Sequence, residues 1–142
     1  MEKYKKYLGI KHDYNGQTCI SLIADIYKNE LQDDSLFTIL WKWIGMNKGR
    51  HNHGSKWWKF IDSENFNKFL NEYAIKIDNI IDIQEYDVIM FSNLRRRIPI
   101  HFGMYIGQNM MIHMQEKSYS KIEMLNDTWR ERIHSVYRSK MV

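Results

Sequence analysis

One cysteine and two histidines are the residues of this sequence best suited to chemistry. Cys19 is the only cysteine among the 142 residues, and His101 and His113 lie 12 positions apart in a distant part of the chain. A thiol becomes a nucleophile when an imidazole accepts its proton, and that imidazole needs a third group to hold its tautomer. The three side chains therefore predict thiol-based nucleophilic catalysis, with Cys19 as nucleophile, His101 as base and His113 as orienting group.

Cys19 is predicted to lie in the first turn of a helix. Gly16 interrupts the preceding segment, and Thr18 is a suitable N-cap. One apolar face follows, formed by Leu22, Ile23, Ile26 and Tyr27. Backbone N–H groups and the helix dipole favour a thiolate at this end of a helix, so we expect a lowered thiol pKa.

The two histidines are predicted to lie on neighbouring strands. Residues 100–106 and 110–114 are apolar, and the Gly-Gln-Asn segment between them is typical of a hairpin turn. Further strands are predicted at 86–91, 120–125 and 134–139, helices at 34–44 and 63–77, and a helical turn at 126–132. Helices first and an antiparallel sheet second predict an α+β fold, which we expect to form one domain over residues 1–142.

Composition is that of a globular protein, with 44% hydrophobic residues and a net charge of +4. The basic excess lies after residue 93, where a solvated surface is the first interpretation and an anionic partner the second. One cysteine cannot form an internal disulfide, and no apolar run is long enough to span a membrane. The N-terminus lacks the apolar region of a secretory signal, so we expect synthesis in a reducing compartment.

Three segments carry a resemblance to a known family. "TCISLI" (18–23), "EYDVIMF" (85–91) and "HFGMYIGQNMMIHM" (101–114) resemble the motifs of the NlpC/p60 family of papain-like cysteine peptidases. The resemblance is closest to the phage tail-assembly branch, similar to the C-terminal domain of the lambda tail protein K. It rests there on "YLGIKHDYNGQTC" (7–19), "KWWKF" (56–60) and "WRERIHSVYR" (129–138).

The resemblance implies a papain-like fold, no cofactor, and Cys19, His101 and His113 as the catalytic residues. It implies attack of the Cys19 thiolate on cell-wall peptides, typically at γ-D-glutamyl–diaminopimelate bonds, with helix N-terminal N–H groups holding the oxyanion. Thr18 stands where the family often has Asp, and Ile20 stands in a position that could narrow the substrate approach. His12 or Tyr14 is the candidate for the oxyanion-site tyrosine of the family, and the sequence does not choose between them.

The resemblance further implies a virion protein of the phage tail tip or hub, made in the host cytoplasm and acting at the host cell wall. Its partners would be other tail proteins and peptidoglycan peptides. The alternative is a structural tail-tip or hub-plug protein with the same fold and little or no turnover. A cellular wall-remodelling hydrolase is a third hypothesis, disfavoured by the missing export signal.

Three other patterns in the sequence have both a functional and a simpler interpretation. His51 and His53 form a His-x-His pair without an obvious third metal ligand, so a mobile polar loop is preferred and no metal is expected. The three arginines at 95–97 precede His101, where a solvated loop is the first interpretation and a contact with another tail protein or with carboxylate-rich wall peptide the alternative. Lysines alternate with tryptophans in "WKW" and "KWW", a pattern more typical of core and interface anchors than of nucleic-acid binding.

Overall fold

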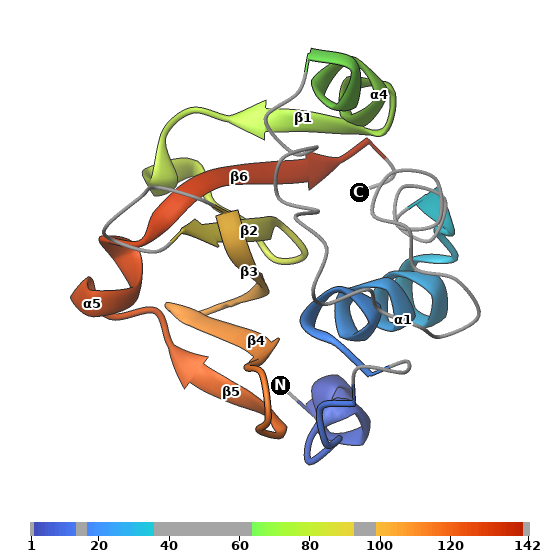
Figure 1. Ribbon diagram of the computed structural model, residues 1–142, viewed down its shortest axis with the longest axis vertical. Coiled ribbons are helices and arrows are strands. Elements are labelled where there is room, and N and C mark those ends of the chain that lie inside the picture. Colours follow the sequence, from blue (N-terminus) through green and yellow to red (C-terminus); the bar gives the residue numbers. More distant parts are fainter. Residues whose placement is uncertain (1, 14–16, 36–63, 93–98, 141–142) are drawn as a thin grey trace.

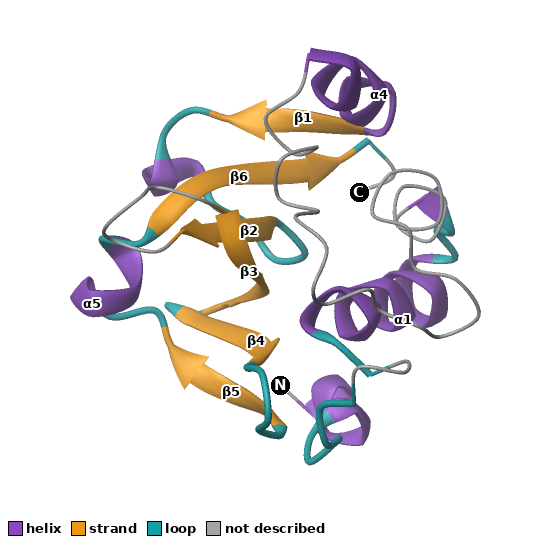
Figure 2. Cartoon of the chain, viewed as in Figure 1, coloured by secondary structure: helices purple, strands orange, loops and turns teal. Residues whose placement is uncertain are grey.

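The computed structural model describes residues 2–13, 17–35, 64–92 and 99–140 of the chain. Helices dominate its first part and strands its second (Figure 2). The helical elements are η1 (Glu2–Tyr7), α1 (Cys19–Leu31), α4 (Glu64–Tyr73), η3 (Ile80–Asp82) and α5 (Asp127–Arg130). The strands are β1 (Ala74–Ile77), β2 (Val88–Ser92), β3 (Pro99–Gly107), β4 (Met110–Met114), β5 (Ser120–Met124) and β6 (Ile133–Ser139). This arrangement confirms the predicted α+β class.

The six strands form one antiparallel sheet in the order β1-β6-β2-β3-β4-β5. Strands β3 and β4 are a hairpin whose turn needs left-handed backbone at Gly107, Gln108 and Asn109, with φ of 91°, 52° and 59°. Glycine and asparagine tolerate that conformation better than most residues, which is why the Gly-Gln-Asn segment predicts the turn correctly. Helix α1 packs against β3 and β4, whereas α5 lies on the opposite side of the sheet (Figure 1).

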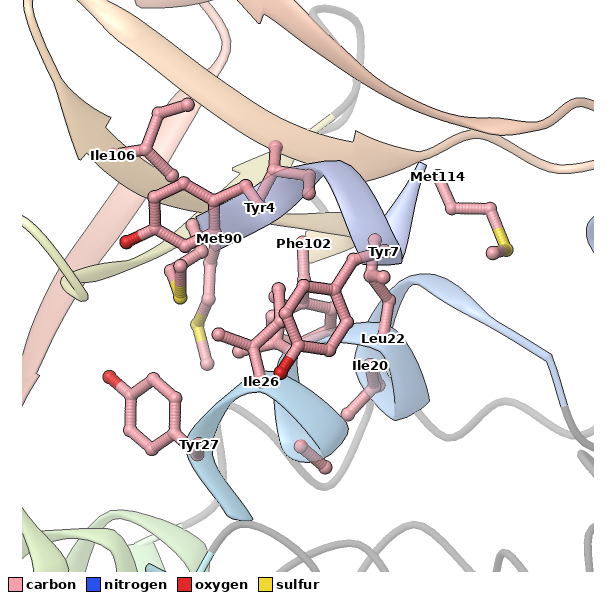
Figure 3. Packing of buried hydrophobic residues seen from close by; sticks show 14 of the residues in the cluster. Tyr4, Tyr7, Ile20, Leu22, Ile26, Tyr27, Met90, Phe102, Ile106 and Met114 are labelled. Atoms are coloured by element: carbon pink, nitrogen blue, oxygen red, sulfur yellow. The ribbon is translucent and has the colours of Figure 1, made fainter. Parts of the chain in front are cut away.

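Alternation along the strands creates two buried clusters, one on each face of the sheet. The α1-side core contains the apolar face of α1 together with Tyr4 and Tyr7 of η1, and alternate residues of β3 and β4 (Figure 3). Those alternate residues are Phe102, Met104, Ile106, Ile112 and Met114. Ile89, Phe91, Met111, Leu125, Trp129 and Val136 form the smaller cluster, which we call the Trp129-side core. His101 and His113 fall between the α1-side residues along their strands, so their side chains face the Trp129-side core.

The helix predicted over residues 63–77 is wrong in its last part. Helix α4 ends at Tyr73, and residues 74–77 form strand β1, which pairs with β6 from Ala74 opposite Ser139 to Ile77 opposite Val136. The sequence pattern is compatible with either structure over so short a segment, and pairing with β6 decides between them. The helix predicted at 34–44 lies almost entirely outside the described residues.

The N-terminal segment contributes a 3-10 helix, η1, that the sequence pattern did not predict. Tyr4 and Tyr7 of η1 are buried, and the Tyr7 hydroxyl donates to Oε2 of Glu30 on α1 at 3.1 Å. The backbone C=O of Tyr7 accepts a hydrogen bond from the Ser120 hydroxyl at 2.6 Å, which ties η1 to the start of β5. The element therefore fixes α1 relative to the β4–β5 edge. None of the helices in the described residues meets the length and apolarity that a membrane span requires.

Candidate active site

The N-terminus of α1 is fixed by a reciprocal capping box. Thr18 is the N-cap, and its hydroxyl oxygen accepts from the Ser21 backbone N–H at 3.2 Å. The Ser21 hydroxyl oxygen in turn accepts from the Thr18 backbone N–H at 2.7 Å. Two backbone N–H groups that a helix end would otherwise leave unsatisfied are thereby paired. The predicted helix start is confirmed, and Cys19 occupies the first helical position.

The Cys19 thiol is not the low-pKa thiolate that we expected from its place at a helix N-terminus. Burial of the sulfur raises its pKa to about 11, although the backbone N–H groups of Phe102, Ile20 and Cys19 act to lower it. The residue as a whole is only partly buried. Desolvation of a charged thiolate outweighs the favourable N–H groups. At neutral pH, Cys19 is therefore a neutral thiol in the resting protein.

His101 and His113 are joined by a hydrogen bond across β3 and β4. Nε2 of His101 lies 2.8 Å from Nδ1 of His113. In the strand register His113 is opposite Gly103, so the two histidines are diagonal neighbours on one face of the sheet. Diagonal side chains are within reach of one another when both are long or aromatic. The structure thus brings together the two histidines that the sequence paired.

Both imidazoles are buried and uncharged at neutral pH. Burial, reinforced by His113 and Arg132, lowers the pKa of His101 to about 3. Burial also lowers the pKa of His113, although its hydrogen bond to Glu123 opposes that shift. His101 is 8% exposed and His113 is 0% exposed. A neutral imidazole has one ring nitrogen that donates and one that accepts, so each hydrogen bond in the pair has a direction.

Glu123 and Trp129 complete the cluster, and sequence reasoning missed both. Nε2 of His113 lies 2.9 Å from Oε1 of Glu123, and Nε1–H of Trp129 donates to Oε2 of Glu123 at 2.9 Å. The Trp129 ring centroid lies 5.9 Å from that of His101 and 5.0 Å from that of His113. The alternation of "SKIEML" beside "MMIHM" was a usable signal, because it places Glu123 diagonal to His113 once the strands pair.

The peptide group between His101 and Phe102 connects the thiol to the histidines. The Cys19 sulfur lies against the N–H of Phe102, whose side chain packs in the α1-side core. His101, one residue earlier, directs its ring to the other face of the strand. Within the described residues no hydrogen bond joins the thiol to the His101 ring, and in catalytic pairs without substrate such a bond is often long or poorly aligned. Nε2 of His101 is engaged by His113, so Nδ1 is the ring nitrogen left for the thiol, and it accepts a proton in the tautomer that carries the ring proton on Nε2.

The remaining predicted site residues have other surroundings. Thr18 is 2% exposed and acts as the cap described above. Ile20 is 4% exposed and lies in the α1-side core with Tyr7 and Leu22 (Figure 3), so its side chain fills the core instead of narrowing a substrate approach. His12 is half-buried, and its backbone N–H donates to the C=O of Ser118 at 2.8 Å.

Several predicted features lie outside the described residues. They are Tyr14, the His51 and His53 pair, the arginines at 95–97, and the two tryptophan-lysine segments. The choice between His12 and Tyr14 for the oxyanion site therefore stays open.

Comparison with known proteins identifies the family and the fold of the chain. The model of the NlpC/P60 family matches residues 13–138, which span Cys19, both histidines and Glu123. A search of curated proteins finds no match. The crystal structure of an NlpC/P60 family protein from Bacillus cereus ATCC 10987 is similar in fold, with a TM-score of 0.59 and 18% identity. The alignment covers 96% of this chain but only 38% of the Bacillus protein. By the match over most of its length, the chain belongs to the NlpC/P60 family.

Proposed function

We propose that the protein is a cysteine peptidase that cleaves peptidoglycan peptides. Members of the NlpC/P60 family are generally cell-wall peptidases, which supports this substrate class. The observation that carries the proposal is the 2.8 Å hydrogen bond between His101 and His113, because it engages Nε2 of His101 and leaves Nδ1 as the ring nitrogen for the thiol. The Cys19 thiol lies against the peptide group that follows His101.

The proposed mechanism begins from a neutral thiol and a neutral imidazole. Cys19 transfers its proton to Nδ1 of His101 as its sulfur attacks the carbonyl carbon of the scissile amide. The Cys19 backbone N–H, at the N-terminus of α1, would donate to the oxyanion of the tetrahedral intermediate. His101 then returns the proton to the leaving amine, and water hydrolyses the acyl-enzyme. Proton transfer during attack, rather than a preformed thiolate, is what the raised pKa of Cys19 requires.

The test is digestion of purified peptidoglycan, with mass spectrometry of the soluble products. We expect the wild-type protein to release peptides cut at γ-D-glutamyl–diaminopimelate bonds, and Cys19→Ala to release none while it stays folded by circular dichroism. If the wild type releases nothing from walls of several peptide types, alone or with its partners, the enzymatic proposal fails.

We also propose that the protein works as part of a phage tail tip or hub, made in the host cytoplasm and carried to the cell wall on the particle. The support is the resemblance of residues 7–19, 56–60 and 129–138 to the tail-assembly branch. Mass spectrometry of particles purified from the organism that encodes the chain tests this role. We expect its peptides to co-purify with tails and its neighbours to be other tail proteins. Intact tails that lack the chain would contradict the assignment.

A structural tail protein with little or no turnover is the second candidate. One observation favours it: burial raises the pKa of the Cys19 thiol to about 11, so the resting thiol is weakly reactive. This candidate predicts that Cys19→Ala leaves both tail assembly and infection unchanged. The peptidase proposal predicts that the same variant assembles normally and delivers its genome poorly through an intact wall.

A further inference from the structure

The side chain of Glu123 makes a directed set of hydrogen bonds at the far end of the histidine pair. Its Oε1 faces Nε2 of His113 at 2.9 Å, and its Oε2 accepts from Nε1–H of Trp129 at 2.9 Å. Nζ of Lys121 lies 3.4 Å from Oε1. Both oxygens of the carboxylate are therefore engaged, one by the buried indole and one by the buried imidazole.

Glu123 is an ionised carboxylate at neutral pH and can only accept hydrogen bonds. Burial acts to raise its pKa, but the hydrogen bonds from Trp129 and His113, together with Lys121, bring the pKa below its usual range. The proton in the bond to His113 must then belong to the imidazole, on Nε2. Because His113 is neutral, its Nδ1 carries no proton and accepts.

The direction of this bond propagates to His101. Nδ1 of His113 accepts, so Nε2 of His101 must donate across their 2.8 Å contact. Neutral His101 then has a bare Nδ1, the atom needed to take the proton of Cys19. If the chain of bonds ran the other way, His101 would carry its proton on Nδ1 and could not act as the base. The same two rings in the same places would be inactive, because a base in the wrong tautomer has no lone pair for the nucleophile.

We propose that Glu123 is a positioning residue that sets the tautomers of both histidines, with Trp129 holding the carboxylate in place. The inference rests on the proposed peptidase function for its consequence, but the tautomers themselves can be measured without substrate. His113 also faces Lys121 of β5 and Arg132, which follows α5, and neither of these cations can accept a hydrogen bond from its ring. Among these groups, Glu123 is the acceptor that fixes the direction of the bonds.

Trp129 makes the substitution Glu123→Gln informative. The indole N–H is a donor only, so a glutamine must turn its carbonyl oxygen towards Trp129 to keep that buried N–H paired. Its amide NH₂ then faces His113 and donates, which places the His113 proton on Nδ1 and the His101 proton on Nδ1. Lys121 opposes this orientation weakly, because its side chain is 46% exposed and its ammonium can turn to water. Removal of the indole N–H by Trp129→Phe frees the glutamine to rotate and to accept from His113 again.

The experiment is ¹⁵N NMR of the histidine rings at neutral pH, in the wild type, Glu123→Gln, and Glu123→Gln with Trp129→Phe. Assignments come from His101→Asn and His113→Asn. In the wild type we expect both histidines to carry the proton on Nε2, and in Glu123→Gln we expect it on Nδ1 of both. The double variant should regain the wild-type pattern. Glu72→Gln is the matched control, since Glu72 lies exposed on α4 and its loss changes the net charge equally.

The chemical consequence is read from alkylation of Cys19, the only cysteine, by iodoacetamide at neutral pH. Glu123→Gln should slow the reaction at least about tenfold, a modest part of what a general base contributes, and the double variant should recover most of it. A purely structural role for Glu123 predicts no recovery of the alkylation rate in the double variant, because the second substitution would only weaken packing further.

Unchanged tautomers in Glu123→Gln would overturn the inference, whatever the activity. If Trp129→Phe unfolds the protein, the single substitution still decides the matter. Correct tautomers and reactivities with no peptide release from any wall would leave this inference standing and remove the proposed function instead.

Discussion

His101 and His113 meet diagonally across two strands, with Nε2 of the first 2.8 Å from Nδ1 of the second, while Gly103 stands directly opposite His113. This offset lets two rings that project from the same face share a hydrogen bond without stacking on one another, and their planes lie at 70°. The geometry also gives the two rings different roles. His101 keeps one nitrogen for the thiol, and His113 uses both nitrogens to link His101 to Glu123.

This division of roles predicts unequal effects of removing each ring. His101→Ala should lower the turnover of peptidoglycan peptides by about 10²–10⁴-fold, as expected for loss of a general base. His113→Ala should lower it less, because His101 can still accept a proton from whichever fraction has the right tautomer. Turnover per folded molecule, measured on the same wall preparation, compares the two. Equal and complete loss in both variants would argue for a different assignment of base and orienter.

The buried, neutral state of His101 predicts a loss of stability in acid. The unfolded chain binds a proton near pH 6.5, whereas the folded protein holds the pKa of His101 at about 3. The stability is complete above about pH 6.5 and falls as the pH drops towards 3, because only the unfolded state gains the proton. One such proton costs about 1.4 kcal/mol per pH unit. Urea unfolding at about pH 7 and pH 5 should show a smaller difference for His101→Asn than for the wild type. If the stability difference between about pH 7 and pH 5 is identical in the wild type and in His101→Asn, His101 is already protonated in the folded protein at pH 5.

The capping box at the start of α1 predicts a local effect on the nucleophile. Thr18→Ala removes the acceptor for the Ser21 N–H and should lower the free energy of unfolding by about 0.5–2 kcal/mol. Because Cys19 is the next residue, peptide release should fall as well. Thr18→Ser keeps the hydroxyl oxygen and is the control, with near-normal stability and release. Thermal unfolding and product yield measured on the same samples test both expectations, and a stable Thr18→Ala protein would show that the cap is dispensable.

Gly103 is predicted to be intolerant of any side chain. A Cβ at this position would lie 3.2 Å from Cε2 of Phe91, 3.3 Å from Sδ of Met111 and 3.5 Å from Cβ of His113. Gly103→Ala should therefore cost about 1–3 kcal/mol of stability, because Phe91 and Met111 must give way, while His113, in ordinary contact, keeps its bond with His101. The urea midpoint and the ¹⁵N resonances of the two rings test these expectations separately. Shifted ring resonances would place the strain on His113 instead.

The elements that carry the site can be predicted from the sequence. Local signals of good quality surround Cys19 and both histidines: a cap at Thr18, an apolar face on α1, and a glycine-containing turn between two apolar strands. Pairing of β3 with β4 follows from the short turn, and the diagonal relation of the histidines follows from the register. The resemblance of the chain to the family rests on the same segments, since these are where the motifs lie.

The features that the sequence predicted wrongly or not at all depend on contacts between distant segments. Residues 74–77 join β6 from about sixty positions away, and no local pattern specifies that pairing. The raised pKa of Cys19 depends on desolvation of the thiol in the folded protein, whereas the helix end alone predicts the opposite shift. Ile20 looked like an obstacle because a linear motif does not show that its side chain points into the core. Glu123 and Trp129 come from two further elements, β5 and α5, and only the folded sheet brings them to His113.

The measurement that tests the central claim most directly is the pH dependence of Cys19 alkylation in the wild type and in His101→Asn. If Nδ1 of His101 takes the thiol proton, the wild type should react at least about tenfold faster near pH 7. The two rates should converge towards pH 11, where the thiol ionises without help from the imidazole. Equal rates across the whole range would show that His101 does not serve Cys19, and the proposed peptidase mechanism would be contradicted.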